Sequence, residues 1–373
     1  MRGEVNPKYD VLGSSLEELR GWMRAAGEPL YRAAQLYHAV YAERRVDFGQ
    51  MSNLPAALRT ELAADCAIGL PKIARRYLSS DGSVRYLLTL PQPENSLPAE
   101  MPSAARVEAV FMPSEGRQTL CISTQAGCAV DCRFCLTAQL GLIRNLTAGE
   151  IVGQVLLLLE DQRERLAPRT NVVLMGQGEP LLNYEPVMAA VRILLDPNGV
   201  GLVARHVTLS TSGIVPGIER LGREPIRPKL AISLNASTDE ERDAIMPVNR
   251  KYPLAALLEA CRAYPLRPWE QLTFEYVLLS GINDSAEDAR RVAKLVAGLR
   301  AKVNLIPWNP GDLSYRAPLP DRIEEFRRVL VEKGVPTFVR YSRGQDVSAA
   351  CGQLALIETI GAAPGAAASA PLA

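Results

Sequence analysis

Three cysteines lie within eight residues, in the stretch Cys128-Ala-Val-Asp-Cys132-Arg-Phe-Cys135. Thiolates this close together can hold three corners of a cubane iron–sulfur cluster, because such clusters are held by Cys thiolates. A cluster that only carries electrons normally takes four Cys ligands. With three, one iron keeps an open position, so the spacing predicts a cluster at which a small molecule can bind and react.

The elements around this loop must position it. Residues 118–124 are expected to form a strand before it, and Thr147 and Glu150 form a capping box that opens an apolar helix after it. The loop would then lie at the carboxyl end of a strand, where α/β barrels carry their chemistry.

A structural zinc site is the alternative interpretation of the same cysteines. Zinc prefers four closed ligands, commonly from two C-x2-4-C pairs, and here only Cys121 lies near enough to be a fourth ligand, inside the expected strand. C-x3-C-x2-C with Phe134 before the last cysteine resembles the signature of the radical S-adenosylmethionine (SAM) superfamily. In that superfamily the amino and carboxylate groups of SAM bind the open iron.

Composition sets further limits. A net charge of +1 gives no overall basic footprint for nucleic acid, and only two histidines are present, which leaves little for a His-based metal site or triad. Seven cysteines that include a cluster motif indicate a reducing compartment. We find no signal peptide and no apolar run long enough to span a bilayer, so we expect a cytoplasmic protein with no membrane partner.

The first part of the chain is expected to be helical. Residues 13–66 show helical spacing, with a capping box from Ser14 to Glu17 and further helices over 31–41 and 56–64. Residues 76–88 then read as a hairpin around Asp81-Gly82, and 107–112 pairs with 118–124. Glu108 alternates with apolar neighbours there, and a glutamate in a strand is usually a solvated surface carboxylate.

From residue 118 the pattern alternates between strand and helix, which favours a parallel sheet covered by helices. The expected strands are 118–124, 171–175, 206–210, 229–234, 271–279, 302–307 and 336–341, and the expected helices are 148–165, 185–195, 214–222, 238–245, 254–263, 286–299 and 321–333. Six or seven units are too few for a closed eightfold barrel. The fold class is therefore α/β, an incomplete barrel with a small N-terminal helical accessory domain. The expected divisions are 1–70 (helical accessory domain), 71–117 (hairpin region and linker), 118–358 (partial barrel with a C-terminal cysteine loop) and 359–373 (disordered tail).

Several of these strands end in small or hydrogen-bonding residues. They are Gly176 to Pro180, Ser210 to Gly213, Ser233 to Asn235, and Trp308 to Pro310. Each of these segments alone is common in ordinary turns. Together they predict a polar cup beside the cluster loop that suits an amino acid, a ribose and an adenine. Two basic stretches, Arg223–Lys229 and Arg242–Lys251, are expected to be solvated faces.

The other cysteines divide into two groups. Cys66 and Cys261 are interpreted as small buried hydrophobes, because a lone cysteine usually packs that way. Cys121 lies near the end of a strand. Cys351 lies in a small-residue loop after the last strand, next to Gly352, where a thiol could be exposed and mobile.

Six motifs resemble the RlmN family of dual-specificity RNA adenine-C2 methyltransferases, and the resemblance runs from about residue 12 to about residue 358. The motifs are Met175-Gly-Gln-Gly-Glu-Pro180, Val207-Thr-Leu-Ser-Thr-Ser-Gly213, Ile232-Ser-Leu-Asn235, Asn304-Leu-Ile-Pro-Trp-Asn309, Arg343-Gly-Gln-Asp346 and Ala349-Ala-Cys-Gly-Gln-Leu354. Gln177 departs from the family, where Met is expected in many members.

The resemblance implies a role for each matching residue and an incomplete (β/α)6 radical SAM barrel. Cys128, Cys132 and Cys135 would ligate a [4Fe–4S] cluster, and Cys351 would carry a methyl group, with Cys121 as the resolving thiol and Glu108 as the base. The residues that would contact SAM are Gly178, Glu179, Ser210, Ser233, Leu234, Asn235 and Asn309.

The implied substrates are an adenosine of 23S rRNA, in the peptidyl-transferase centre, and adenosine 37 of tRNA. Two SAM molecules would be used per turnover, one as methyl donor to Cys351 and one as radical source. The implied partners are these RNAs and an electron-donor protein such as flavodoxin, and the implied state is a monomer.

Three alternatives stay open from the sequence. The related Cfr enzymes methylate carbon 8 of the same adenosine with the same constellation. Another radical SAM reaction, such as glycyl-radical activation, would leave Cys121 and Cys351 without a role. A non-catalytic iron–sulfur or zinc protein is the third.

Overall fold

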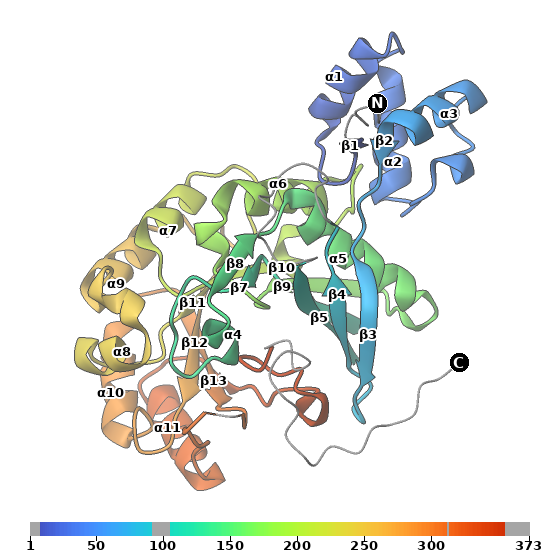
Figure 1. Cartoon of the computed structure of the whole chain (residues 1–373). Coiled ribbons are helices and arrows are strands. Elements are labelled where there is room, and N and C mark those ends of the chain that lie inside the picture. Colours follow the sequence, from blue (N-terminus) through green and yellow to red (C-terminus); the bar gives the residue numbers. More distant parts are fainter. Residues whose placement is uncertain (1–7, 92–104, 312, 355–373) are drawn as a thin grey trace.

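A computed structural model describes residues 8–91, 105–311 and 313–354 (Figure 1). The expected tail at 359–373 and most of the loop between 91 and 105 lie outside the described residues. Within the described part, no helix is long and apolar enough to cross a membrane.

The N-terminal module is helical, as the sequence predicts. It contains α1 (Leu16–Ala25), α2 (Tyr31–Tyr41) and α3 (Ala56–Asp65), and the two short strands β1 (Tyr9–Asp10) and β2 (Cys66–Ala67) pair in parallel beside them. The predicted capping box is wrong by one residue, because Ser15 and Glu18 form it. Ser14 is unavailable since its hydroxyl is 2.7 Å from that of Tyr9 and donates to the Asp10 carbonyl at 3.3 Å.

A ten-stranded sheet forms the rest of the framework, in the order β14-β13-β12-β11-β10-β9-β6-β5-β4-β3. The seven strands from β14 to β6 run parallel, and β5, β4 and β3 continue the same sheet in antiparallel fashion. Their bounds are β3 Lys72–Leu78, β4 Val84–Thr89, β5 Arg106–Ser114, β6 Arg117–Cys121, β9 Arg169–Leu174, β10 Val207–Thr211, β11 Lys229–Ser233, β12 Leu272–Leu278, β13 Ala301–Pro307 and β14 Thr337–Val339.

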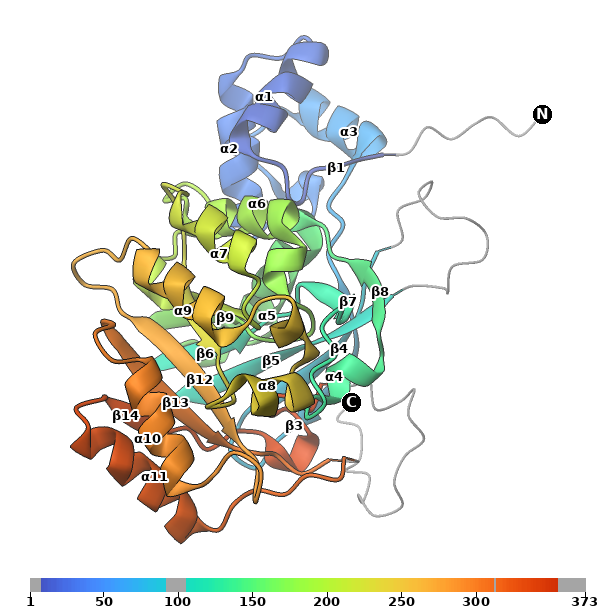
Figure 2. The same ribbon diagram turned by 90° about the vertical axis from the view of Figure 1, so that its left-hand side faces the viewer.

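Helices follow each of the first six parallel strands and lie outside the curved sheet (Figures 1 and 2). They are α5 (Ala148–Asp161), α6 (Tyr184–Leu195), α7 (Val215–Gly222), α8 (Asp239–Ile245), α9 (Leu254–Ala263), α10 (Ala286–Leu295) and α11 (Pro320–Glu332). Short 3-10 turns join the elements: η1 Phe48–Gln50, η2 Arg163–Arg165, η3 Pro180–Leu182, η4 Ala204–His206, η5 Pro247–Arg250 and η6 Gln345–Val347. Among the described strands β14 and β3 are the two edges, so the barrel is open and the expected incomplete (β/α)6 fold is confirmed.

Strand alternation separates an outer core from an inner face. On β5, Val107, Ala109 and Phe111 belong to the main apolar core with the helices. Successive strand residues point to opposite faces, so Glu108 and Val110 point into the barrel. Val110 indeed packs in a separate small cluster with Cys121. The inner face therefore carries the candidate site.

Candidate active site at the cysteine loops

Two short paired strands flank the cluster loop. β7 (Gln125–Gly127) pairs antiparallel with β8 (Leu142–Asn145), and the loop between them contains the short helix α4 (Leu136–Gln139). Gly127 has φ +72°, and a Cβ there would overlap the carbonyl oxygen of Gly141, so only glycine fits. The Cys128 amide donates to the same carbonyl at 2.9 Å. The ribbon fixes where the first cysteine leaves the sheet.

The three cysteines of the loop interact with one another. Burial raises the pKa of the Cys128 thiol to about 12 and that of Cys132 well above its usual value, and the neighbouring thiols raise both further. Three adjacent soft sulfur donors, each half-buried, fit an iron–sulfur cluster, which would supply the positive charge that keeps them as thiolates. No three His, Cys, Asp or Glu side chains of the described chain converge on a point that would hold a single metal ion.

Three other segments fix the loop. The Arg133 amide donates to the Ile245 carbonyl at 2.9 Å, and the Trp308 indole donates to the Phe134 carbonyl at 3.2 Å. The Leu136 amide donates to the Gly352 carbonyl at 2.8 Å. The last bond joins the cluster loop directly to the segment that carries Cys351.

Cys351, Cys121 and Cys135 come from three distant segments and meet here. Cys351 is an exposed residue whose thiol has protein on most sides, and this desolvation raises the pKa of the thiol to about 11, with Glu275 and Cys135 raising it further. Burial also raises the pKa of Cys121, and its second cause is the nearby Cys351 thiol. Cys121 packs against Ala349 and Leu354, on either side of Cys351. Two thiols that could exchange are thus neighbours beside the cluster loop.

Glu108 is not a solvated surface carboxylate, and that expectation is wrong. It is completely buried and forms an ion pair with the buried Arg85. Its carbonyl accepts a hydrogen bond from the Ser123 hydroxyl at 2.6 Å. The reason is that β5 lies between β4 and β6, so its even-numbered face lines the barrel. Glu108 shares that face with Val110, next to Cys121.

The first of the strand ends that are expected to form a polar cup carries Gly178 and Glu179, just after β9. Gly178 has φ +101°, and a Cβ there would lie 2.5 Å from the Cβ of Gln125. Glu179 is buried, and its carboxylate accepts from the amides of Leu181 at 3.0 Å and Ser212 at 2.6 Å. Burial raises the pKa of Glu179, although these hydrogen bonds act to lower it.

The rest of the cup lies at the ends of the next strands. Ser210 and Ser233 are half-buried near the ends of β10 and β11, and Leu234 and Asn235 are buried just beyond. Asn235 has φ +58°, and its side-chain oxygen accepts from the Val277 amide at 2.8 Å. Asn309 donates to the Cys351 carbonyl at 3.1 Å. These bonds fix the rim of the cup.

Arg242 is a site residue that the sequence analysis missed. The expectation of a solvated basic face at Arg242–Lys251 is wrong for Arg242, which is completely buried. It donates to the carbonyls of Ser212 at 2.6 Å, Ser233 at 3.1 Å and Leu234 at 3.0 Å. Burial lowers its pKa to about 10. The available signal was its spacing of three residues from Ile245, on the buried side of α8.

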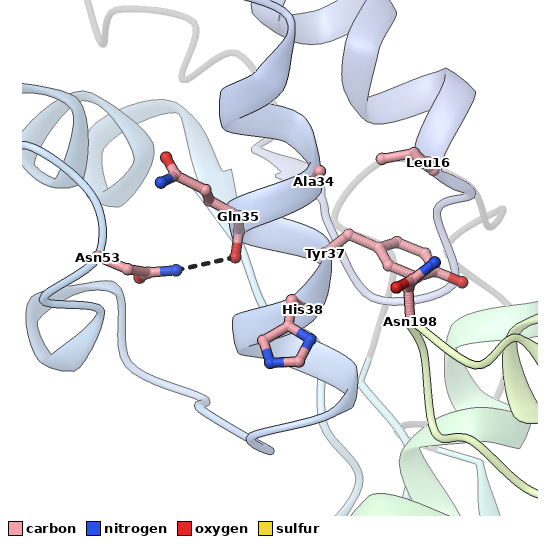
Figure 3. A pocket seen from close by; sticks show the side chains of 7 residues that line it. All are labelled: Leu16, Ala34, Gln35, Tyr37, His38, Asn53 and Asn198. Carbon is pink, nitrogen blue, oxygen red and sulfur yellow. Dashed lines mark hydrogen bonds between the residues drawn. The ribbon is translucent and has the colours of Figure 1, made fainter.

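A separate cavity of about 360 Å³ lies in the N-terminal module (Figure 3). Its lining comes from α1, α2, Asn53 and Asn198, and the Asn53 amide donates to the Gln35 carbonyl at 3.2 Å across it. None of the cysteines or strand ends lines it. The chemistry therefore belongs to the cysteine loops and not to this cavity.

Comparison with known proteins agrees with this geometry. Residues 122–295 match the radical SAM superfamily, and residues 9–68 match the ribosomal RNA large subunit methyltransferase N-terminal domain. A radical SAM methyltransferase from Sphaerobacter thermophilus is 42% identical, superimposes with a TM-score of 0.85, and is covered over 99% of its length and 93% of this chain. The fold and the cysteine loops define a radical SAM enzyme, a class that works with a [4Fe–4S] cluster and SAM.

Curated relatives narrow the family. A probable dual-specificity RNA methyltransferase RlmN of Koribacter versatilis is 48% identical over 91% of this chain and 99% of its own length. The dual-specificity RNA methyltransferase RlmN of Anaeromyxobacter sp. is 47% identical over 94% of this chain and 91% of its own. The chain belongs to the RlmN family of dual-specificity RNA methyltransferases, and the resemblance found in the sequence is confirmed.

Proposed function

We propose that this protein methylates carbon 2 of adenosine, in the peptidyl-transferase centre of 23S rRNA and at position 37 of tRNA, with Cys351 as methyl carrier. The observation that carries the proposal is the meeting of Cys351 with Cys121 beside the cluster loop. Other radical SAM reactions, such as glycyl-radical activation, leave this pair of thiols without a role.

The chemistry of adenine explains why a carrier is needed. Carbon 2 lies between two ring nitrogens and is electron-poor, so it does not attack an electrophilic methyl group. A thiolate does, and Cys351 lies next to the rim of the cup, where Asn309 binds its carbonyl. In this proposal SAM contacts Gly178, Glu179, Ser210, Ser233, Leu234, Asn235 and Asn309, and Cys128, Cys132 and Cys135 ligate the cluster.

When bound, the cluster supplies the electron for radical formation, and two SAM molecules per turnover supply the methyl group and the hydrogen-abstracting radical. The carbon held on the Cys351 sulfur would give one hydrogen atom to that radical and then bond to carbon 2 of the ring. The unpaired electron that this leaves on the ring would return to the cluster when the ring proton is lost. Glu108 takes the ring proton, and Arg85 orients its carboxylate. Cys121 would attack the Cys351 sulfur, so that a disulfide forms and the bond from sulfur to carbon breaks. The released carbon would take up the proton that the Cys121 thiol gives up, which leaves a methyl group on the ring. An external electron donor such as flavodoxin and a thiol reductant complete the cycle.

The same proposal places a monomeric enzyme in the cytoplasm. No disulfide joins any of the seven cysteines, which agrees with a reducing compartment.

Nucleoside mass spectrometry tests the proposal. Ribosomal RNA and tRNA that lack the modification are incubated anaerobically with the reconstituted protein, SAM and reductant, and digests are compared with 2-methyl- and 8-methyladenosine standards. We expect 2-methyladenosine from both RNAs, and none with Cys351→Ala. A product of 8-methyladenosine would overturn the carbon-2 assignment, and methylation by Cys351→Ala would overturn the carrier.

A further inference from the structure

Positively charged residues stand at the amino ends of the parallel strands. Strand β6 begins with Arg117, β9 with Arg169 and β11 with Lys229, and Lys302 is the second residue of β13. Arg205 lies just before β10. We call these five residues the amino-end ring.

The register and the alternation of the strands place most of the ring on the inner face. Arg117 and Arg169 are direct partners in the pairing of β6 with β9. Arg117 has the parity of Cys121, which packs inside, whereas the neighbours of Lys229 and Lys302, Leu230 and Val303, belong to the outer core. By alternation, Lys229 and Lys302 therefore point inward. The ring faces the amino-end opening of the barrel.

These cations lie close enough to repel one another. Burial lowers the pKa of Lys229, and Lys302 and Arg340 lower it further. Arg169, Arg205 and Lys229 likewise lower the pKa of His206, after burial. Like charges on adjacent strands destabilise a sheet. The mutual repulsion of the ring residues therefore reduces the stability of the fold.

Acidic residues of the protein compensate little of this charge. Within the described chain, no member of the ring forms an ion pair within 4.0 Å. Glu270 lies nearby but pairs with Arg267 at 3.0 Å and Arg227 at 3.9 Å. Glu275 is the inner carboxylate, and it accepts from the Asn304 amide at 2.9 Å. The ring thus presents net positive charge to whatever enters from the amino ends.

We infer that the amino-end ring binds backbone phosphates of the RNA that flank the target adenosine. Glu275 of β12 is the register partner of Asn304, which lies on the same face of β13 as Lys302 and donates to Glu275 at 2.9 Å. Glu275 also acts on the Cys351 thiol, so the ring and the methyl carrier face the same interior. Lys302 lies two residues before Asn304, about 7 Å along the strand. A base that reaches Cys351 would leave its phosphates at the ring. Arg and Lys supply this kind of sequence-independent contact.

An acidic electron-donor protein is the other partner that a cationic surface could serve. It must approach the cluster, which belongs to the carboxyl ends of the strands, whereas the ring lies at the amino ends. The inference rests on the proposed function only in taking RNA as the substrate.

The test measures binding of a fluorescein-labelled tRNA stem-loop with an unpaired adenosine, by anisotropy over a series of salt concentrations. The double variant Lys229→Gln/Lys302→Gln should weaken binding about tenfold near 0.1 M salt and lower the salt slope by about 0.7 to 0.9 for each phosphate that is no longer neutralised. The exposed Arg169→Gln should show a smaller loss in the same direction. Lys294→Gln/Lys333→Gln, on the outer side of the barrel, is the matched control and should bind normally.

Two further readouts separate the outcomes. Methylation of Cys351 from SAM, followed by peptide mass analysis without RNA, should stay normal in every ring variant, which shows that the fold and the cofactor site are intact. Unchanged affinity and salt slope in both ring variants would overturn the inference, as would a loss confined to flavodoxin binding. The wild-type product could prove to be 8-methyladenosine while the ring variants still bind RNA weakly. The proposed carbon-2 function would then be wrong, and the inference that the ring binds RNA would be supported.

Discussion

The positions of two thiols decide how the methyl group can be released. Cys121 is buried against Val110 and Leu354, and burial raises the pKa of its thiol, so it keeps its proton until it attacks the Cys351 sulfur. In the proposed route, the protein and RNA are joined through a methylene bridge until a second thiol attacks. Cys121→Ala should therefore accumulate a covalent protein–RNA species that survives denaturing gels and is removed by nuclease.

The companion variants give this prediction its control. Cys351→Ala should form no adduct, since it never acquires the methyl group, and the double variant should behave in the same way. Normal turnover by Cys121→Ala, or loss of activity without trapped RNA, would make Cys121 a packing residue.

The cluster ligands are tested by absorbance. Replacing Cys128, Cys132 or Cys135 by Ala should remove the visible absorbance of the reconstituted protein, because in the proposed ligation each thiolate holds one corner of the cluster. Cys261→Ala is the control, since Cys261 is buried in α9 and packs in the main core. An intact spectrum in all three loop variants would exclude the ligand assignment.

For single residues, the sequence predicts which residues belong to the site better than it predicts their burial and their contacts. The spacing of the cysteines was enough to indicate the radical SAM superfamily. The burial of Glu108 and Arg242 was not predictable, because it depends on strands and carbonyls that are distant in sequence. Arg85 lies 23 residues before its partner Glu108, and nothing in a local pattern links them.

Among the elements, the β3–β4 hairpin has a task beyond extending the sheet. Its tip holds the segment that leads to Cys351: the Ser79 hydroxyl donates to Asp346 at 2.6 Å and the Ser80 amide at 2.9 Å. The Gly344 amide donates back to Asp81 at 3.0 Å. These contacts clamp the carrier loop against the barrel.

The clamp should weaken in acid. Burial alone would raise the pKa of Asp81, but hydrogen bonds from Ser83, Gly344 and Ser79 outweigh it and lower the pKa to about 2. The pKa of Asp346 is lowered by Ser79 and Ser80. A lowered folded-state pKa gives stability that is present above the unfolded value of about 4 and is lost as pH falls through the folded value.

Hydrogen exchange over residues 343–354, corrected for its intrinsic pH dependence, measures this. Protection should hold at pH 6 and fall between about pH 4 and pH 2. Asp346→Asn should lower protection at pH 6 and flatten the profile. If the pH profile of Asp346→Asn is identical to that of the wild type, these hydrogen bonds do not hold the carrier loop.

Arg242 joins three elements, and its replacement should be costly. Arg242→Leu would leave the carbonyls of Ser212, Ser233 and Leu234 without this donor, at about 1–3 kcal/mol for each that stays buried and unsatisfied. We expect a loss of about 3 kcal/mol or more in urea unfolding, together with weaker SAM binding. Arg250→Leu, at an exposed position nearby, is the control and should unfold near the wild-type midpoint.

The sequence predicted helices and strands well where the periodic pattern of apolar residues was long. The alternation of strands and helices after residue 118 was predicted, because each unit buries one face. The β7–β8 ribbon was missed, since a strand of three residues such as Gln125–Gly127 has no readable period.

For the whole molecule, local sequence patterns could not predict how the N-terminal module, the hairpin region and the barrel pack together. Residues 71–117 read as a hairpin region and linker, whereas the structure adds β3, β4 and β5 to the barrel sheet itself. The N-terminal module lies next to α6 (Figure 2), and the Tyr37 hydroxyl donates to Asp196 at 3.0 Å. Such contacts join residues more than a hundred positions apart, beyond any periodicity.

The module also meets the barrel through two glycine backbones. Gly13 has φ +93°, and a Cβ on it would overlap the amide of Gly149, at the start of α5. A Cβ on Gly149 would in turn overlap the Leu12 carbonyl. Neither neighbour can move like a flexible side chain, because both are backbone. Gly149→Ala should therefore push the module away from the barrel, at about 1–3 kcal/mol.

Limited proteolysis at residues 66–71, where the chain passes from the module to the sheet, measures this displacement. We expect cleavage there to be faster in Gly149→Ala, with cluster absorbance and Cys351 methylation unchanged, since both depend on the barrel alone. Gly21→Ala is the matched control: a Cβ at Gly21 in α1 meets nothing within 4 Å, and alanine there should stabilise the helix by about 0.5–1 kcal/mol. If Gly149→Ala is cleaved no faster than Gly21→Ala, the backbone contact does not hold the module in place, and the bond from Tyr37 to Asp196 would be the next one to remove.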